Sequence, residues 1–237
     1  MKNLSILVWV SLISFNVNAQ KIIEKTLGHK DQIINVELKF ASDIKVKTWD
    51  RSTVYFKADI WTEDSKYQDF YTLDIDETDT KISIVSNAKP LFKELQEEWN
   101  RNHPNKKKRY YNTGNQYEFN YVLYVPKNSN FTVSSINGSL TSEVIEGDFT
   151  ADLINGDIDI KKYAGTLDLK TINGEIDLKI SNTSLVAETI HGNIYADEKL
   201  SFKATNRHVG QKVEGSFNNA DHTLRLNTIN GNMYLRL

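Results

Sequence analysis

The stretch of sequence that decides the fold lies at residues 136–174 and reads INGSLTSEVIEGDFTADLINGDIDIKKYAGTLDLKTING. The triplet Ile-Asn-Gly begins at Ile136, Ile154 and Ile172, so it recurs every eighteen residues. Ile190-His191-Gly192 occupies the next step, and Ile229-Asn230-Gly231 follows later, out of phase. A fixed repeat of this length predicts a repetitive architecture in which similar units pack on one another.

A second series of glycines divides each unit into two similar halves. Gly147 and Gly165 lie midway between the triplets, and Thr183 takes the next nine-residue position. Two residues after each of these positions stands a bulky apolar side chain, as in Leu140, Phe149, Ile158, Leu167, Ile176, Leu185 and Ile194. The residues between them are mostly charged or hydroxylated. This alternation predicts short β-strands with one buried face and one solvated face.

Two arrangements of these strands fit the pattern. Asn-Gly is a favoured two-residue hairpin turn, so the units could form antiparallel hairpins. They could instead wind as a coil in which each eighteen-residue turn stacks on the previous one in parallel. We favour the coil, because it stacks like on like and accounts for the period of eighteen.

The coil makes specific predictions about the repeat. It places the three asparagines of the triplets in one hydrogen-bonded column. It also places Ile136, Ile154, Ile172 and Ile190 inside, with Asn-Gly turns that allow positive φ. We assign a structural role in the turns to Asn137, Gly138, Gly147, Asn155, Gly156, Gly165, Asn173, Gly174, Gly192, Asn230 and Gly231. Beyond Leu200 the period loosens, which predicts one or two irregular coils that end in a terminal strand.

The region before the repeat also has strand periodicity, without the glycines. Strands are expected at 33–40, 43–48, 53–61, 70–75, 81–85 and 117–125. They could form a small antiparallel cap or degenerate coils that cover the end of the stack. Residues 90–101 form the one good helix candidate, with Leu91, Leu95 and Trp99 on one face. The fold class expected is therefore all-β, a β-solenoid with one short helical insertion.

The first residues predict export. Lys2 precedes an apolar run, and Val17-Asn18-Ala19 resembles a cleavage site, so residues 1–19 are expected to be a cleaved signal peptide. The remaining regions are 20–89 (N-terminal β region), 90–116 (insertion) and 117–237 (repeat). The expected location is the periplasm or the cell surface. The chain has no cysteine, which excludes disulfides and thiolate metal sites, and no second long apolar segment.

The one strongly basic run lies in the insertion. Lys106, Lys107, Lys108 and Arg109 precede Tyr110 and Tyr111. Together with Trp99, these residues are our candidates for ligand contact, and an acidic glycan is the preferred ligand because an exported protein seldom meets nucleic acid. The alternative is an ordinary solvated loop. The formal net charge of -2 gives no general reason to bind nucleic acid.

The repeat resembles a family of bacterial adhesin-type domains of unknown function. The resemblance rests on the Ile-Asn-Gly-[Ser/Asp/Glu]-[Leu/Ile] units, on the intervening Glu-Gly-Asp-Phe and Ala-Gly-Thr-Leu, and on residues 42–50. It implies a β-solenoid on an exported or envelope protein and a binding or structural function. It carries over no catalytic residue, and the insertion at 90–116 departs from the family's pattern.

An enzymatic function is not indicated. The outward carboxylates, Asp157, Asp159, Asp168, Glu175 and Asp177, are explained by strand alternation. The histidines, His29, His103, His191, His208 and His222, lack the spacing of metal ligands. Calcium at Gly156-Asp157 is disfavoured because the turns lack paired glycines. We expect no cofactor or metal and a non-catalytic envelope protein. The alternatives are a periplasmic subunit that packs against a neighbouring membrane protein and, less favoured, a polysaccharide-active enzyme.

Overall fold

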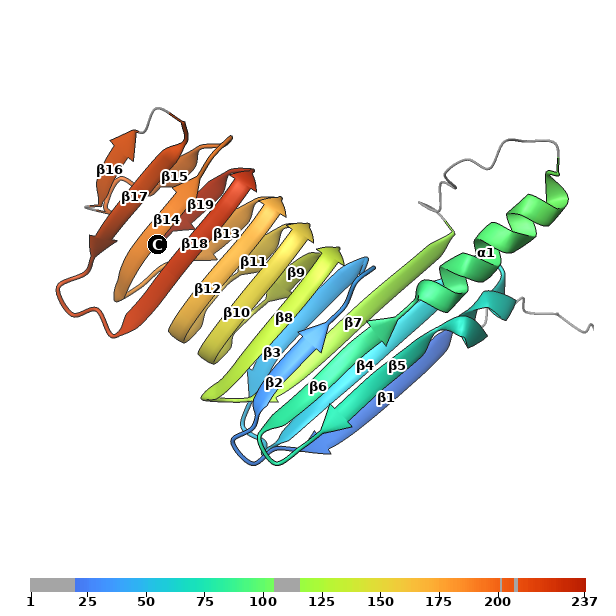
Figure 1. Ribbon diagram of the computed structural model, residues 1–237. Coiled ribbons are helices and arrows are strands. Elements are labelled where there is room, and N and C mark those ends of the chain that lie inside the picture. Colours follow the sequence, from blue (N-terminus) through green and yellow to red (C-terminus); the bar gives the residue numbers. More distant parts are fainter. Residues whose placement is uncertain (1–19, 105–115, 201, 207–208) are drawn as a thin grey trace, which may run out of the picture.

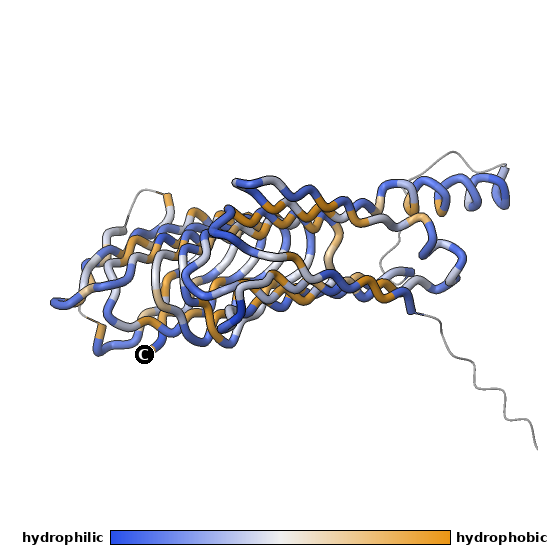
Figure 2. Tube along the Cα trace, turned by 90° about the horizontal axis from the view of Figure 1, so that it is seen from below, coloured by the Kyte–Doolittle hydropathy of each residue, from blue (hydrophilic) through white to orange (hydrophobic). Residues whose placement is uncertain are grey.

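The computed structural model describes residues 20–104, 116–200, 202–206 and 209–237 (Figure 1). The predicted signal peptide, 1–19, lies outside these residues. The described chain is mostly β and forms two large sheets that contain parallel and antiparallel pairs. The sheets lie as two layers (Figure 2) and enclose one continuous hydrophobic core. The prediction of a mostly β fold is therefore confirmed.

The first sheet has nine strands. In spatial order they are β1 (Lys21–Gly28), β4 (Thr53–Thr62), β7 (Tyr117–Pro126), β3 (Asp43–Trp49), β9 (Ser139–Ser142), β11 (Ile158–Ile160), β13 (Ile176–Lys179), β19 (Met233–Arg236) and β15 (Ile194–Ala196).

The second sheet has ten strands. In spatial order they are β16 (Lys203–Asn206), β17 (Gln211–Ser216), β14 (Thr183–Thr189), β18 (His222–Asn230), β12 (Tyr163–Asn173), β10 (Ile145–Asn155), β8 (Ser129–Asn137), β2 (Ile33–Glu37), β6 (Lys81–Asn87) and β5 (Thr72–Glu77).

In the described part of the chain, one α-helix and one 3₁₀ turn accompany the sheets. Helix α1 (Lys89–Asn102) covers the predicted 90–101, with a proline in its first turn, where a missing N–H costs nothing. Leu91 and Leu95 are buried as expected, and Phe92 packs 4.7 Å from Phe40 between ring centroids. Helix α1 also contacts η1 (Ser65–Phe70).

The repeat stacks in parallel, as the coil requires and the hairpin does not. We call each pair of consecutive strands a rung: rung 1 is β8 and β9, rung 2 is β10 and β11, and rung 3 is β12 and β13. Strand β10 pairs in parallel with both β8 and β12, and β11 with both β9 and β13. Asn155 pairs with Asn137 on one side and Asn173 on the other, a shift of eighteen residues.

The apolar columns lie inside with one exception. The residues two after each glycine position are fully buried from Leu140 to Leu185, and each such side chain contributes about 1.5–3 kcal/mol. The prediction that the triplet isoleucines lie inside is wrong. Ile154 and Ile172 are each 39% exposed and Ile190 is 45% exposed. The strand alternation continues through the triplet, so that the preceding residue, Leu153 or Thr171, is the buried one.

The expected reason for the triplet glycines also needs correction. Positive φ occurs at Gly138 but not at Gly156, Gly174, Gly192 or Gly231. At Gly174 a Cβ atom would overlap the carbonyl oxygen of Gly156 one rung away. These glycines are therefore required by the close approach of successive turns. Positive φ is instead found at the midway glycines, where φ is 137° at Gly147 and 117° at Gly165.

The last rung is not last in space. We call β14 and β15 rung 4, and β18 and β19 the terminal rung. Strand β18 lies between β12 and β14, and β19 lies between β13 and β15. Rung 4 therefore does not stack directly on rung 3, although its triplet is eighteen residues away. The predicted irregular coil after Leu200 is an antiparallel hairpin of β16 and β17 at the sheet edge.

The N-terminal region combines both of the arrangements that the sequence left open. Strands β2 and β3 continue the parallel stacks, next to β8 and β9. The outermost strands are antiparallel: β1 pairs with β4, β4 with β7, and β5 with β6. The six strands predicted before the repeat are all present, and β1 was missed.

Candidate functional site: the aromatic hollow

The parallel stack opens on the outer face of the nine-stranded sheet, between β3 and β9. Strand β3 pairs with β9 only over Asp43–Lys45, whereas it pairs with β7 over its full length to Trp49. The chain leaves β9 at Ser142 and turns through Glu143 into β10. The two strands therefore diverge, and a hollow forms where the regular repeat begins.

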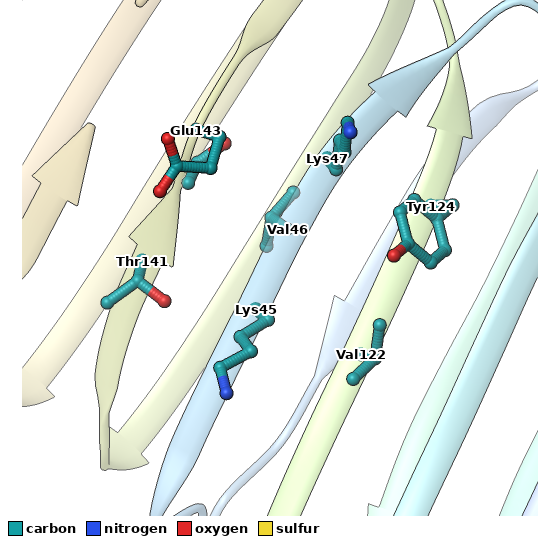
Figure 3. Close-up of a pocket in the computed structure, with 8 residues that line it drawn as sticks. Lys45, Val46, Lys47, Val122, Tyr124, Thr141 and Glu143 are labelled. Atoms are coloured by element: carbon teal, nitrogen blue, oxygen red, sulfur yellow. The ribbon is translucent and has the colours of Figure 1, made fainter. Parts of the chain in front are cut away.

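The hollow has a volume of about 330 Å³, and Figure 3 shows its side chains. It is lined by Lys45, Val46, Lys47, Val122, Tyr124, Thr141, Ser142 and Glu143. The Ser142 hydroxyl is buried and has no hydrogen-bond partner among the described residues. The lining therefore combines an aromatic ring, two ammonium groups, a carboxylate and hydroxyls, a mixture suited to binding a small polar group.

An aromatic cluster borders the hollow on the side of β4. Tyr124 and Tyr55 lie directly opposite each other on β7 and β4, with ring centroids 5.8 Å apart. Trp49 stacks on Tyr124 at 5.1 Å with an angle of 16° between the rings. The Arg51 guanidinium lies 4.7 Å from the centroid of Trp49. We call these residues, together with the lining of the hollow, the aromatic hollow.

The cations of the aromatic hollow are weakly neutralised. Lys45 lies 3.5 Å from Asp43, and no carboxylate within 4 Å of Lys47 or Arg51 is present in the described part of the chain. By contrast Lys127, at the end of β7, binds Glu146 at 2.9 Å and Asp50 at 3.0 Å, and these carboxylates raise the pKa of Lys127. Partial burial, followed by the Glu24 carboxylate, raises the pKa of Tyr55, so its hydroxyl stays protonated.

A second hollow of about 370 Å³ adjoins the first on the same face. It shares Lys45 and Val122 with the aromatic hollow, and its further lining is more acidic, with Asp59 and Glu118. The outer face of β4, β7 and β3 is therefore uneven over two neighbouring hollows. It can contact more than one unit of an extended ligand.

On the same face of the nine-stranded sheet, the charged side chains beyond β9 are mostly paired with one another. There the outward carboxylates are paired within the sheet: Asp159 binds Lys161 at 2.7 Å, and Asp177 binds Arg236 through two hydrogen bonds of 2.7 Å. Tyr195 and Tyr234 form an isolated aromatic pair at 5.4 Å. This part of the face offers few unpaired groups, so the aromatic hollow is the better candidate for ligand contact.

The predicted turn residues form continuous columns in the structure. Asn155 donates a hydrogen bond to Asn137 (3.1 Å), Asn173 to Asn155 (2.8 Å) and Asn230 to Asn173 (2.7 Å). The predicted asparagine column is thus confirmed, and it extends into the terminal rung. A column of buried hydroxyls runs beside it: Thr171 donates to the carbonyl of Gly156, Thr228 to that of Gly174, and Thr189 to that of Gly231.

The ligand-contact residues predicted in the insertion lie apart from the aromatic hollow. Trp99 is on α1 and stacks on His103 with centroids 4.6 Å apart. Lys106, Lys107, Lys108, Arg109, Tyr110 and Tyr111 lie outside the described residues, so the basic run stays a prediction. The aromatic hollow was not predicted. Its only sequence signal was the outward Lys45, Lys47 and Trp49 on one strand, which alternation alone explains as a solvated face.

Within the described residues, no cluster of three or more histidine or acidic side chains is arranged to hold a metal ion. Asp157, considered above for calcium, accepts a hydrogen bond from the backbone N–H of Glu175 at 2.8 Å. None of the helices in the described residues is both long enough and apolar enough to cross a membrane.

The chain belongs to the Toastrack DUF4097 family, whose sequence profile matches residues 29–236. This confirms the resemblance noted from the repeat. Among solved structures, a "putative cell adhesion protein" from Clostridium sporogenes is similar with a TM-score of 0.59 and 10% identity, over 92% of this chain and 99% of that one. A "putative adhesin" from Bacteroides fragilis matches with a TM-score of 0.43 and 9% identity, over 92% of this chain and 98% of that one.

At 10% identity the Clostridium sporogenes structure supports the fold alone. A search of the curated proteins gave no match.

Proposed function

We propose that this protein is an exported, non-catalytic, adhesin-type binding module on a β-solenoid, which contacts an acidic glycan of the envelope or extracellular space through the aromatic hollow. The observation that carries the proposal is the three-ring cluster beside Lys47 and Arg51, two cations with no carboxylate within 4 Å among the described residues. The parallel register of eighteen-residue rungs supports the solenoid assignment.

Sugar recognition fits this chemistry. A pyranose ring presents C–H groups that pack against aromatic side chains, and its hydroxyls form hydrogen bonds with charged and hydroxylated groups. Lys47 and Arg51 would attract the carboxylates of a uronic acid unit. The names of the structural neighbours, which refer to adhesion, are consistent with a binding protein.

The experiment is a titration of the mature protein with oligogalacturonate of defined length, monitored by calorimetry. Trp49→Ala combined with Tyr124→Ala should weaken binding at least tenfold. Tyr195→Ala combined with Tyr234→Ala is the matched control, because it removes the other aromatic pair on the same sheet face. Equal losses in the two variants, or no binding by the unmodified protein, would rule out the aromatic hollow as the site.

Export and location are part of the same proposal. Mass spectrometry of the protein recovered from its native cell should give an N-terminus at Gln20. Proteolysis of intact cells should remove a surface adhesin and spare a periplasmic subunit. Full protection would favour the periplasmic alternative.

A further inference from the structure

A second outward surface follows the triplets on the ten-stranded sheet. The isoleucines of the five triplets lie in one row along β8, β10, β12 and β18, and Ile190 continues the row directly after β14. The row is in register, because the residues that flank each isoleucine pair with those of the next strand. Ile154, Ile172 and Ile190 are 39–45% exposed. Ile136 and Ile229 are half-buried. A row of large apolar side chains that reaches solvent at several rungs is unusual on a protein surface.

The asparagine column runs beside this row. Each amide in its interior donates one hydrogen bond and accepts one along the column, which fixes the orientation of the amide. An asparagine side chain has two N–H donors and two acceptor positions on its oxygen. Among the described residues, one donor and one acceptor position of Asn155 and of Asn173 therefore stay free for a ligand. We call the isoleucine row and Asn137, Asn155, Asn173 and Asn230 the ladder strip.

The surroundings of the ladder strip decide which ligands can reach it. The glycine column comes next along the chain, and no side chain projects there. The strip itself has no charged residue. Two residues before the isoleucines stand Asp152, Lys170 and Glu188, and beyond the glycines stand the exposed carboxylates of Asp157 and Glu175. Four of these five groups are carboxylates, so an anionic polymer is disfavoured. The uncharged strip itself suits a neutral ligand with an apolar face and hydroxyl groups.

The distance between successive rungs of the ladder strip limits the choice of ligand further. Successive rungs are about 4.8 Å apart, as neighbouring strands in any sheet are. A β-1,4-linked pyranose chain in its extended form advances by about the length of one sugar ring per unit, which is close to this spacing. Both faces of each unit carry axial C–H groups, and the equatorial hydroxyls lie at its edges. An α-1,4-linked chain curves and cannot follow a straight row.

We propose that the ladder strip binds an uncharged, extended, β-linked polysaccharide that lies along the stack, with its sugar rings on the isoleucine row and its hydroxyls on the asparagine amides. This site is separate from the aromatic hollow, which lies on the other sheet. The repetition of Ile-Asn across rungs then has a binding role in addition to its role in the turns.

The test is calorimetric titration of the mature protein with chitohexaose and cellohexaose, with maltohexaose as the α-linked control. The β-linked hexamers should bind saturably, and maltohexaose should bind at least tenfold more weakly. Ile154→Ser combined with Ile172→Ser should weaken binding of the β-linked hexamers at least tenfold. Ile33→Ser is the matched control, because Ile33 is 48% exposed elsewhere on the same sheet. Thermal unfolding verifies that each variant is folded.

The outcomes separate this proposal from the proposed function. Trp49→Ala with Tyr124→Ala should leave binding of the β-linked hexamers unchanged, since those residues line the aromatic hollow. Absence of saturable binding by the unmodified protein, equal binding of maltohexaose, or equal loss in Ile33→Ser would overturn the assignment of the ladder strip. None of these results bears on the aromatic hollow, which the oligogalacturonate titration tests separately.

Discussion

The first three rungs and the last two differ in how sequence order relates to spatial order. Rungs 1 to 3 stack consecutively, each eighteen residues after the one before. Rung 4 keeps this spacing in the sequence but does not stack on rung 3, because the terminal rung lies between rungs 3 and 4. The comparison shows that the repeat period defines what a rung is, whereas the side chains of each rung decide which rungs are neighbours.

The side chains favour the terminal rung as the neighbour of rung 3. Residues 166–174 read TLDLKTING and residues 223–231 read TLRLNTING, so their triplets and hydroxyls match. Arg236 forms two hydrogen bonds with Asp177, and Asn230 extends the asparagine column. Rung 4 has no basic residue in β15, and His191 replaces the asparagine. It is therefore suited to the outer position.

The largest loss of stability is expected from a substitution at Gly231, where the terminal rung packs closely against rung 3. In Gly231→Ala the new Cβ would overlap the carbonyl oxygen of Gly174, so we expect the free energy of unfolding to fall by about 3 kcal/mol in urea titrations. Gly28→Ala is the control, since no atom lies within 4 Å of its added Cβ, and it should change stability by less than about 0.5 kcal/mol. Similar losses in both variants would mean that the terminal rung is not closely packed.

A smaller effect is expected from the hydroxyl column. Thr228→Val removes the hydrogen bond to the carbonyl of Gly174 (3.0 Å) at a fully buried position, which should lower the free energy of unfolding by about 1 kcal/mol. Thr189→Val removes the equivalent bond to Gly231 at rung 4. Because rung 4 is the last rung of the stack, with only the β16–β17 hairpin beyond β14, Thr189→Val should mainly speed hydrogen exchange within β14. Identical exchange patterns in the two variants would argue against an outer position for rung 4.

The smallest expected effect is a gain in stability from the substitution His191→Asn. His191 lies at the end of the asparagine column, beside Asn230 of the terminal rung. In His191→Asn a fifth amide could join the column, and we expect about 0.5 kcal/mol of added stability, measured by urea titration. A loss of stability would show that the column does not continue from Asn230 to residue 191.

Much of this architecture follows from the sequence. The period of eighteen and the strand alternation predicted the parallel stack, the buried columns from Leu140 to Leu185 and the asparagine column. The burial of the triplet isoleucines was predicted wrongly. The prediction assumed that the in–out alternation of side chains breaks at the triplet, whereas in the structure the alternation continues and turns the isoleucines outward. The intercalation of the terminal rung escaped prediction because strand pairing between residues far apart depends on which side chains meet, and spacing carries no such information.

The aromatic hollow escaped prediction for a related reason. Tyr55, Tyr124 and Trp49 come from three strands, and the contacts among them appear only once β4, β7 and β3 are neighbours. The hollow itself depends on where β9 ends relative to β3. Strand ends of this kind are the least predictable feature of a sequence.

The absence of cysteine in the chain permits a direct test of the rung order. In the double variant Asn173→Cys with Asn230→Cys, the two cysteines are on adjacent strands about 4.8 Å apart, within the range of a disulfide. In Asn173→Cys with His191→Cys they are two strands apart, about 10 Å, which is too far. Mild oxidation of the folded protein should therefore produce an intramolecular disulfide in the first variant and none in the second. A disulfide between positions 173 and 191, with none between 173 and 230, would contradict the intercalation of the terminal rung.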